Sequence, residues 1–466
     1  MSAGGHPLEP NPEEMRALGD GALDLLVRFV EGLPTASSAD LDGALELGRE
    51  LRATPPPEEP VPFERALATV ERAAAKAIET AGPGYLAYIP GGGLFTSAIG
   101  EFLAQGLNRY TGISSVAPGL AAIEAGVIDW LCDLFDLPEG SGGILTTGGS
   151  LANFSAVVCA RSTLSEDFVN GNVYASEQAH HSIAKAVRLA GFPPDALRLI
   201  QCDDALRMDA DALERAIAAD RDEGRRPCLV VGSAGTTNTG AIDPLPRLAE
   251  IAEREGLWLH ADAAYGGFFQ LTERGGERLV GIERADSITL DPHKSMFLPY
   301  GTGCLLVRDA ERLRRAHSLG ATYLQDLEVD EDLPSFADQS PELTRENRGL
   351  RIWLPLQLHG IGAFRRALDE KLDLAEIAYE RLRDVPELEV PWRPQLSNVA
   401  FRLRDGGEED NRRLLERINA SRRIFLSSTV LDGRYTLRIS VLSHRTHGDR
   451  IEEAVEIIRT EARRAS

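Results

Sequence analysis

Short apolar runs alternate with helical patterns between Gly142 and Val307, and this alternation constrains the fold more than any other feature of the sequence. Strands that alternate with helices indicate a mostly parallel sheet covered by helices on both faces, which is the α/β layered class. Ligands of such sheets bind at the carboxyl ends of the strands, so the side chains that follow each run are candidates for a functional site. The predicted strands are Gly143–Leu145, Asn172–Tyr174, Leu197–Ile200, Cys228–Val231, Leu257–His260, Ser287–Leu290 and Gly303–Val307.

The residues before the alternation predict an N-terminal helical arm, which we place at residues 1–80. Apolar residues recur at helical spacing in Pro12–Gly32 and again from Phe63 to about Thr80, on either side of a Pro-rich linker at 54–62. The apolar faces of these helices need a partner surface, and a second copy of the chain would supply one. Residues 81–360 are predicted to form the large domain.

The residues after the alternation predict a loop, a long helix and a small α+β domain at residues 361–466. The charged, Pro-containing stretch from Gln325 to Thr344 is poorly patterned for a core and is typical of a mobile loop. A helix is predicted from about Ile352 to Leu382. Beyond it we predict strands at Asn398–Leu403, Ile424–Leu426 and Tyr435–Ser440, a helix around 410–420 and a closing helix from Gly448.

The charge and the cysteines exclude several classes of partner and compartment. The formal net charge of −22 argues against nucleic-acid binding, which needs a basic face, and against attraction to anionic membranes. No apolar run reaches the roughly 18–20 residues of a membrane span. The five cysteines are scattered without disulfide or metal-ligand spacing, which suits a reducing compartment, so we expect a cytoplasmic protein.

The turn Thr146–Asn153 places Gly148, Gly149 and Ser150 before a helix. Backbone N–H groups at a helix start, together with a hydroxyl, make a cradle for a phosphate. A tight turn with a serine N-cap explains the same residues and is the alternative. The turn also resembles the nucleophile elbow of hydrolases, but Ala152 takes the place of the last glycine. Since no acid-then-histidine pairing follows either, a hydrolase is disfavoured.

Two further strand ends carry a histidine and an acid. His180 follows the strand at Asn172–Tyr174, where an imidazole could stack on a flat ring; a buried structural histidine is the alternative. Asp262 follows an apolar strand and lies among alanines, so its carboxylate needs a charged or protonated partner. A protonated ring nitrogen would supply one.

Lys294 follows the strand Ser287–Leu290, in the stretch Asp291-Pro-His-Lys. The chain has 4 lysines against 46 arginines, so a lysine at a strand end indicates a need that arginine cannot meet. An amine can lose its proton and condense with an aldehyde, whereas a guanidinium cannot. An incidental surface lysine beside a turn is the alternative.

Together these four strand ends supply a phosphate cradle, a stacking ring, an acid for a pyridinium and an amine for an aldehyde. Those are the needs of pyridoxal 5′-phosphate (PLP). Metal binding is the competing hypothesis. Apart from the adjacent pair His180-His181, the histidines do not fall at metal-ligand spacings, so no metal is expected.

The chain resembles the group II PLP-dependent amino-acid decarboxylases and is most similar to their aromatic-L-amino-acid branch. The resemblance runs from about residue 12 to residue 460. It implies a type I aminotransferase-like fold, an obligate homodimer with active sites at the subunit interface, and decarboxylation of an L-amino acid, most simply an aromatic one, to the amine. Its motifs are Tyr-Leu-Ala-Tyr-Ile-Pro90, Ala-Ser-Glu-Gln-Ala-His180, Gly-Thr-Thr237, His-Ala-Asp262-Ala-Ala-Tyr and Asp-Pro-His-Lys294.

The resemblance also implies roles for individual residues. Lys294 would hold PLP covalently, Asp262 would pair with the pyridine nitrogen and His180 would stack on the ring, and these three are the predicted catalytic residues. The other predicted PLP contacts are Gly148, Gly149, Ser150, Thr237, Ala264, Asp291 and His293. The predicted substrate pocket comprises Tyr88, Gly91 and Tyr110.

The sequence departs from the family pattern in the loop. The family's loop tyrosine, which protonates the substrate carbon, is replaced by Phe336 or, if the segment is aligned from its other end, by Ala337. Neither side chain can donate a proton. Relatives that lack this hydroxyl can be aldehyde synthases, which use molecular oxygen and release aldehyde, ammonia and peroxide. We favour plain amine formation, with His180, His293 or water as the proton donor, and keep the aldehyde synthase as the first alternative.

The sequence departs from the aromatic branch in the pocket as well. Ile89 and Gly91 stand where that branch usually has Phe and Thr. Arg109 could pair with the distal acid of a substrate, so decarboxylation of an acidic amino acid is a second alternative, although a solvated arginine is the favoured interpretation of this residue. A non-catalytic homologue is the alternative from another class, and the intact set of three predicted catalytic residues counts against it.

Overall fold

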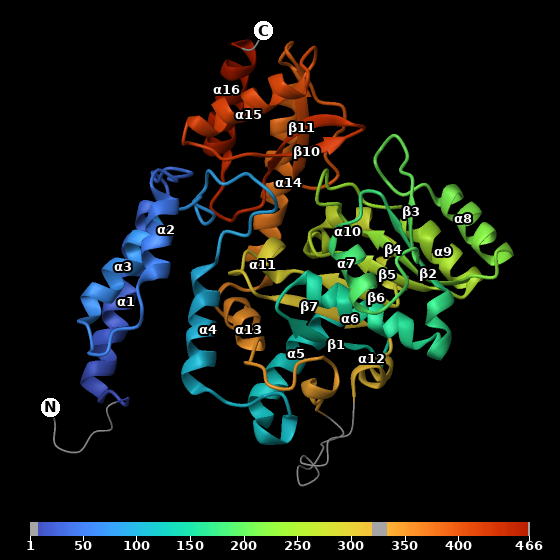
Figure 1. Cartoon of the computed structure of the whole chain (residues 1–466), viewed down its shortest axis with the longest axis horizontal. Coiled ribbons are helices and arrows are strands. Elements are labelled where there is room, and N and C mark those ends of the chain that lie inside the picture. The colour runs from blue at the N-terminus through green and yellow to red at the C-terminus, as the bar shows by residue number, and fades with distance from the viewer. Residues whose placement is uncertain (1–7, 319–332, 465–466) are drawn as a thin grey trace.

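The computed structural model describes residues 8–318 and 333–464 and confirms the predicted α/β fold (Figure 1). Its centre is a seven-stranded sheet with the order β1-β7-β6-β5-β4-β2-β3. Strand β7 runs antiparallel to both of its neighbours, and the other neighbouring pairs are parallel. The strands are β1 (Gly142–Thr146), β2 (Gly171–Ser176), β3 (Leu197–Ile200), β4 (Arg226–Ser233), β5 (Trp258–Asp262), β6 (Ser287–Leu290) and β7 (Gly303–Val307).

Helices pack around this sheet (Figure 1). Helix α6 contacts β4, β6 and β7, and its buried face contains small residues such as Ala152, Ala156 and Ala160, which let the helix approach the strands closely. The helices of this part are α4 (Phe95–Leu107), α5 (Pro118–Leu134), α6 (Gly149–Ser162), α7 (Ser182–Leu189), α8 (Ala210–Asp222), α9 (Leu245–Glu255), α10 (Glu273–Leu279), α11 (Pro292–Ser295), α12 (Ala310–His317) and α13 (Gly349–His359).

The N-terminal arm consists of three helices that stand beside the body of the molecule (Figure 1). They are α1 (Pro12–Gly32), α2 (Ala44–Ala53), which the sequence pattern missed, and α3 (Phe63–Ala75), which ends before the predicted Thr80. Helix α1 begins at a capping box, in which the Asn11 side chain accepts the N–H groups of Glu13 and Glu14. Within the described chain, none of the three helices buries a residue.

The C-terminal part has its own antiparallel sheet, in the order β10-β11-β9-β8, and its own apolar core. Leu86 of the segment before α4 belongs to that core. The Leu86 amide donates to the Phe425 carbonyl at 3.0 Å, and its carbonyl accepts the Ser440 amide at 2.9 Å. The elements are α14 (Ile361–Arg383), β8 (Leu388–Glu389), β9 (Asn398–Leu403), α15 (Glu408–Ala420), β10 (Ser427–Leu431), β11 (Arg434–Ser440) and α16 (Gly448–Arg463).

Two predicted elements are wrong. The helix predicted at 352–382 is two helices, α13 and α14, because Gly360 between them has φ +67° and ψ 152°, a conformation that favours glycine and ends a helix. The strand predicted at 424–426 lies too early. Phe425 makes a single bridge with Tyr85, and the strand itself is β10, which begins at Ser427.

Part of the predicted loop from Gln325 to Thr344, residues 325–332, lies outside the described residues. Within the described ranges, no helix is both long enough and apolar enough to cross a membrane.

Candidate active site

A cavity of about 300 Å³ lies where five strands of the large sheet end. The turns that follow β1, β2, β4, β5 and β6 supply its walls, as expected for parallel strands, whose carboxyl ends share one edge. All ten residues predicted to contact PLP line it. They are Gly148, Gly149, Ser150, His180, Thr237, Asp262, Ala264, Asp291, His293 and Lys294.

Lys294 lies on α11, a single helical turn that follows β6. Its Nζ atom is 2.9 Å from Oδ2 of Asp291. The Nδ1–H group of His293 donates to the carbonyl of Thr302 at 2.7 Å, which fixes that imidazole at the cavity wall. The other carboxylate oxygen of Asp291, Oδ1, is buried and has no hydrogen-bond partner within the described part of the chain. A buried acceptor in this state is a place for a ligand that carries a donor.

Asp262 is the last residue of β5, and its side chain is held from two directions. Its Oδ2 atom accepts Nδ2 of Asn153 at 3.0 Å, and its Oδ1 atom accepts the amide of Ala264 at 3.3 Å. The side chain also lines the cavity. An oriented carboxylate that faces a cavity suits a cationic ring nitrogen.

His180 lies across the same cavity, and burial lowers its pKa, although the charge of Asp262 opposes this effect. Its ring is therefore neutral at pH 7. The amide of Ser182 donates to His180 Nδ1 at 3.3 Å, so that nitrogen is an acceptor and the ring proton is on Nε2.

In the turn from β1 into α6, the position of Gly149 leaves no room for a side chain. A Cβ atom on Gly149 would lie 2.9 Å from Oδ2 of Asp291 and 3.3 Å from the Cβ of Ala264. Gly148 before it has φ +158°. The first amides of α6 are therefore close to the cavity wall, where a helix N-terminus favours an anion.

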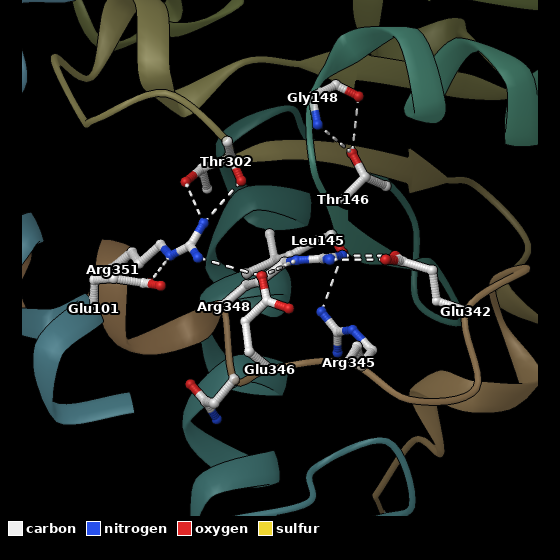
Figure 2. A network of polar contacts seen from close by, with 12 residues as sticks. Glu101, Leu145, Thr146, Gly148, Thr302, Glu342, Arg345, Glu346, Arg348 and Arg351 are labelled. Carbon is white, nitrogen blue, oxygen red and sulfur yellow. Dashed lines mark hydrogen bonds and ion pairs between the residues drawn. The ribbon is translucent and has the colours of Figure 1, made fainter. Parts of the chain in front are cut away.

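Three arginines of the segment before and in α13 hold two turns of the cavity in place (Figure 2). Arg345 and Arg348 both donate to the carbonyl of Leu145, at 3.1 and 3.0 Å, which fixes the end of β1. Arg351 donates to the carbonyl of Gly301 at 2.8 Å and to the hydroxyl of Thr302 at 3.4 Å. The Thr302 carbonyl is the acceptor of His293, so the network supports the turn that carries Lys294.

The residues predicted to bind the substrate do not line this cavity in the single chain. Tyr88 is more than half exposed, at 57%, and its amide donates to Ser427 Oγ at 3.0 Å. The Tyr110 hydroxyl donates to the Leu343 carbonyl at 2.8 Å. Gly91 packs against the turn that carries Lys294, because a Cβ on it would lie 1.9 Å from the His293 carbonyl oxygen. Their predicted roles stay predictions.

Phe336, one of the two residues predicted to replace the family's loop tyrosine, lies in the hydrophobic core. Its side chain is fully buried, and the guanidinium of Arg345 lies 5.0 Å from the centre of its ring. The described structure does not bring Phe336 to the cavity that Lys294 lines.

Sequence patterns did not single out Asn153, Ser182 and His260, which support the site. Two signals could have found them. Asn153 stands one helical turn after Gly149 and so faces the same side of α6, and His260 stands two residues before Asp262 on the same face of β5. Within the described residues, no group of three His, Cys, Asp or Glu side chains is arranged to hold a metal ion.

The residues present fit PLP. The cavity combines helix amides for a phosphate, an imidazole, a carboxylate for a ring nitrogen and an amine for an aldehyde. The buried Oδ1 of Asp291 has no hydrogen-bond partner among the described residues, which leaves an acceptor beside the Lys294 amine for a further donor.

Residues 48–404 match the model of the pyridoxal-dependent decarboxylase conserved domain. The chain is 34% identical over 448 residues to an aromatic-L-amino-acid decarboxylase of Bacillus atrophaeus, which covers 94% of this chain and 93% of that protein. It is 30% identical over 484 residues to a phenylacetaldehyde synthase of Petunia hybrida, covering 97% and 95%. The crystal structure of Oryza sativa TDC with PLP and tryptamine matches with a TM-score of 0.93 and 27% identity over 99% of both chains.

Proposed function

The chain belongs to the pyridoxal-dependent decarboxylase family, and from this premise we propose that it converts an aromatic L-amino acid to the amine and carbon dioxide. PLP-dependent decarboxylation of an amino acid is the reaction of the family. The aromatic substrate is the proposed part, and the similarity to the decarboxylase of Bacillus atrophaeus supports it. The observation that carries the proposal is the convergence of Lys294, Asp262 and His180 on one cavity.

When bound, PLP supplies an aldehyde for an amine and a ring that takes up the electron pair left by departing carbon dioxide. We assign Lys294 Nζ as the atom that holds the aldehyde carbon, and the first amides of α6 at Gly149 and Ser150 as the phosphate site. His180 is assigned as the ring that stacks on the cofactor. These assignments place each group on a different strand end, so the fold sets their spacing.

Asp262 is assigned as the partner of the ring nitrogen. Its two carboxylate oxygens each accept one N–H group from the protein, and each keeps a lone pair for a further donor. A protonated ring nitrogen is that donor, because a buried carboxylate is stabilised by an opposite charge. The acid in turn keeps the nitrogen protonated, which is the form that accepts electrons.

His180 and His293 are the candidate proton donors in place of the family's loop tyrosine. His180 carries its proton on Nε2, since Nδ1 accepts the Ser182 amide. The Nδ1–H of His293 is engaged by the Thr302 carbonyl, so we favour Nε2 of His180 as the site from which the substrate carbon is protonated, with water supplying the proton that the neutral imidazole gives up.

We also propose that the active unit is a homodimer whose substrate pocket is completed at the interface by Tyr88, Gly91 and Tyr110. Two surfaces support this. The arm helices α1–α3 bury none of their residues within the described chain. Helix α4 exposes Phe102, at 68%, together with Leu103 and Leu107. Apolar faces of this kind mark protein contact sites.

An aldehyde synthase is the second candidate. The described loop residues 333–344 contain no tyrosine, and by the resemblance Phe336 or Ala337 stands where the family has one. The chain is also similar, at 30% identity, to a phenylacetaldehyde synthase. The two candidates share the decarboxylation and differ in the product that follows it.

The test is to incubate the purified protein and PLP with a panel of L-amino acids, and to measure carbon dioxide, amine, aldehyde and peroxide separately. We expect carbon dioxide and amine in equal amounts, with aromatic substrates fastest. Lys294→Ala should abolish turnover and the absorbance of bound cofactor, whereas Lys185→Ala, at an exposed lysine of α7, should change neither. Peroxide in step with product would establish the second candidate, and transamination without carbon dioxide would overturn both.

A further inference from the structure

A row of buried polar side chains, joined by hydrogen bonds, extends from Asp262 away from the cavity. Asn153 of α6, His260 of β5 and Ser287 of β6 are each at most 1% exposed. These residues come from three different elements, which the sheet brings together. Burying a polar group costs free energy unless it is hydrogen-bonded, so the hydrogen bonds of these three residues indicate what they do.

Only one orientation of the Asn153 side-chain amide satisfies its hydrogen bonds. A carboxylate can only accept, so the Asn153 amide nitrogen must face Asp262, to which it donates at 3.0 Å. The Asn153 carbonyl oxygen then points the other way, where it lies 3.0 Å from Nε2 of His260. Since a carbonyl only accepts, Nε2 of His260 carries a proton.

The other ring nitrogen of His260, Nδ1, accepts a hydrogen bond. Burial lowers the pKa of His260 to about 4, so the ring is neutral at pH 7 and Nδ1 is bare. Nδ1 therefore accepts the Ser287 hydroxyl at 2.8 Å, and that hydroxyl oxygen accepts the indole N–H of Trp258, also at 2.8 Å. Each hydrogen bond from Trp258 through Ser287, His260 and Asn153 to Asp262 thus pairs one donor with one acceptor.

The second hydrogen of the Asn153 amide leads to His180. It is donated to the Ser182 hydroxyl at 2.9 Å. The hydroxyl of Ser182 lies 2.8 Å from Nδ1 of His180, which also accepts the Ser182 amide, so the hydroxyl hydrogen goes to that nitrogen. One amide group therefore orients the acid and, through the Ser182 hydroxyl, helps to orient the imidazole across the cavity.

We propose that Asn153 and His260 are positioning residues that hold Asp262 and His180 in the orientation needed for PLP. The inference rests on the proposed function of this cavity. Asn153 acts through its two N–H groups, and His260 acts through Asn153, because its Nε2–H engages the Asn153 carbonyl and prevents the amide from turning over. Neither residue is proposed to do chemistry on the substrate.

A role in packing alone makes a different prediction from a role in positioning. Packing would need only the volume and the burial of the two side chains, which apolar residues of similar size supply. Positioning needs the N–H groups, so it is lost with an apolar substitute and kept with an amide. Gln at position 260 can donate to the Asn153 carbonyl and accept from Ser287, whereas Phe can do neither.

The test is the affinity of the apoprotein for PLP, measured by absorbance or fluorescence titration without substrate. We expect Asn153→Leu and His260→Phe each to weaken PLP binding by about tenfold or more, similar to the loss of a residue that orients a metal ligand. His260→Gln should stay within about threefold of the wild type. In an Asp262→Asn background, Asn153→Leu should weaken binding by less than about threefold, because coupled residues are not additive.

Ser155→Ala is the matched control, because Ser155 is buried on α6 two residues after Asn153 and does not line the cavity. Equal PLP affinities of Asn153→Leu and Ser155→Ala, or additive effects with Asp262→Asn, would overturn the inference. If Asn153→Leu does not fold, the pair at position 260 decides: equal affinities for the Phe and Gln variants would overturn it.

The failure of the inference can be told apart from the failure of the proposed function. A wild-type protein that takes up no PLP contradicts the proposed function. A wild type that binds PLP and is weakened by Asp262→Asn, but not by Asn153→Leu, contradicts this inference alone.

Discussion

The Nζ atom of Lys294 lies 2.9 Å from Oδ2 of Asp291, three residues before it on the same turn. Asp291 is nearly fully buried, and its Oδ1 atom has no hydrogen-bond partner within the described chain. The amine is therefore the main compensation for the charge of this acid in the absence of cofactor, because His293 Nδ1 is farther away, at 3.6 Å, and donates to a carbonyl.

We expect Lys294→Ala to destabilise the apoprotein by about 2 kcal/mol, since it leaves a buried carboxylate without its counter-charge. Adding Asp291→Asn should restore most of this loss, because the uncompensated charge is then gone. Urea unfolding of the two apoproteins measures the difference. A double variant that is no more stable than Lys294→Ala would contradict the pairing.

Gly91→Ala should disturb the Lys294 turn. A Cβ on Gly91 would lie 1.9 Å from the carbonyl oxygen of His293 and 3.0 Å from its carbonyl carbon, and backbone atoms cannot move aside cheaply. We expect a loss of about 2 kcal/mol in the free energy of unfolding and weaker PLP binding, as for overpacked sites. Gly93→Ala is the control. Gly93 has φ +67° but open space around it, so alanine there should cost about 1 kcal/mol and leave PLP binding unchanged.

The buried His260 should make the protein less stable in acid. Burial lowers its pKa from 6.5 to about 4. Between these values the unfolded chain binds a proton that the native ring does not, so stability falls as the pH falls through this window. The full contribution is about 3 kcal/mol, and it is absent above pH 6.5.

His260→Gln should remove this share of the acid lability. The measurement is the free energy of unfolding at several pH values between 7 and 4, in wild type and variant. Burial also lowers the pKa of His444, to about 3, and this residue titrates in an overlapping window in both proteins. The informative quantity is therefore the difference between the two profiles. Parallel profiles would show that the native ring titrates like the unfolded one.

Glu124 and Arg345 form an ion pair with both side chains fully buried, at 2.6 Å. The other carboxylate oxygen of Glu124 accepts the amides of Arg348 and Gly349, at the start of α13. Glu124→Gln should cost about 3 kcal/mol, because it leaves a buried guanidinium unpaired.

The control for this pair is Glu380→Gln, which removes the carboxylate from an exposed pair with Arg383. It should change the free energy of unfolding by less than about 0.5 kcal/mol. Urea unfolding under the same conditions compares the two. Similar losses at both sites would mean that Glu124 does not compensate Arg345.

Phe336→Tyr should leave the ratio of amine to aldehyde unchanged. The Phe336 side chain is fully buried against Arg345 and does not line the cavity, so a hydroxyl placed there does not reach a bound substrate. The added polar group should instead cost about 1–3 kcal/mol of stability. The products are measured together with thermal unfolding. A shift of the product toward amine would show that this residue leaves the core during turnover.

The sequence was sufficient to predict the site residues that directly follow a strand. Lys294, Asp262 and His180 each follow an apolar run, and parallel strands bring such ends to one edge, so their meeting in one cavity follows from the pattern alone. The contact of Asn153 with His260 joins residues 107 positions apart, and the contact of Arg345 with Glu124 joins residues 221 apart. Periodicity within one element carries no information about such pairs.

The two wrong elements have local causes. The apolar pattern is continuous through Gly360, so the break between α13 and α14 depends on the conformation of one residue. Phe425 and Leu426 have the apolar character typical of a strand, but Phe425 bridges to Tyr85 and not to β11. This pairing depends on a segment more than 300 residues earlier in the chain.

Leu86 is hydrogen-bonded on both sides by the C-terminal part of the chain, and Gly91, five residues later, presses on the His293 carbonyl. The last sixty residues therefore help to position the turn that carries Lys294, although none of them lines the cavity. A chain shortened to end near Arg404, where the match to the family model stops, would keep every residue of the cavity wall. It would still lose the hydrogen bonds that hold Leu86, so we expect the turn that carries Lys294 to be less firmly positioned in the shortened chain.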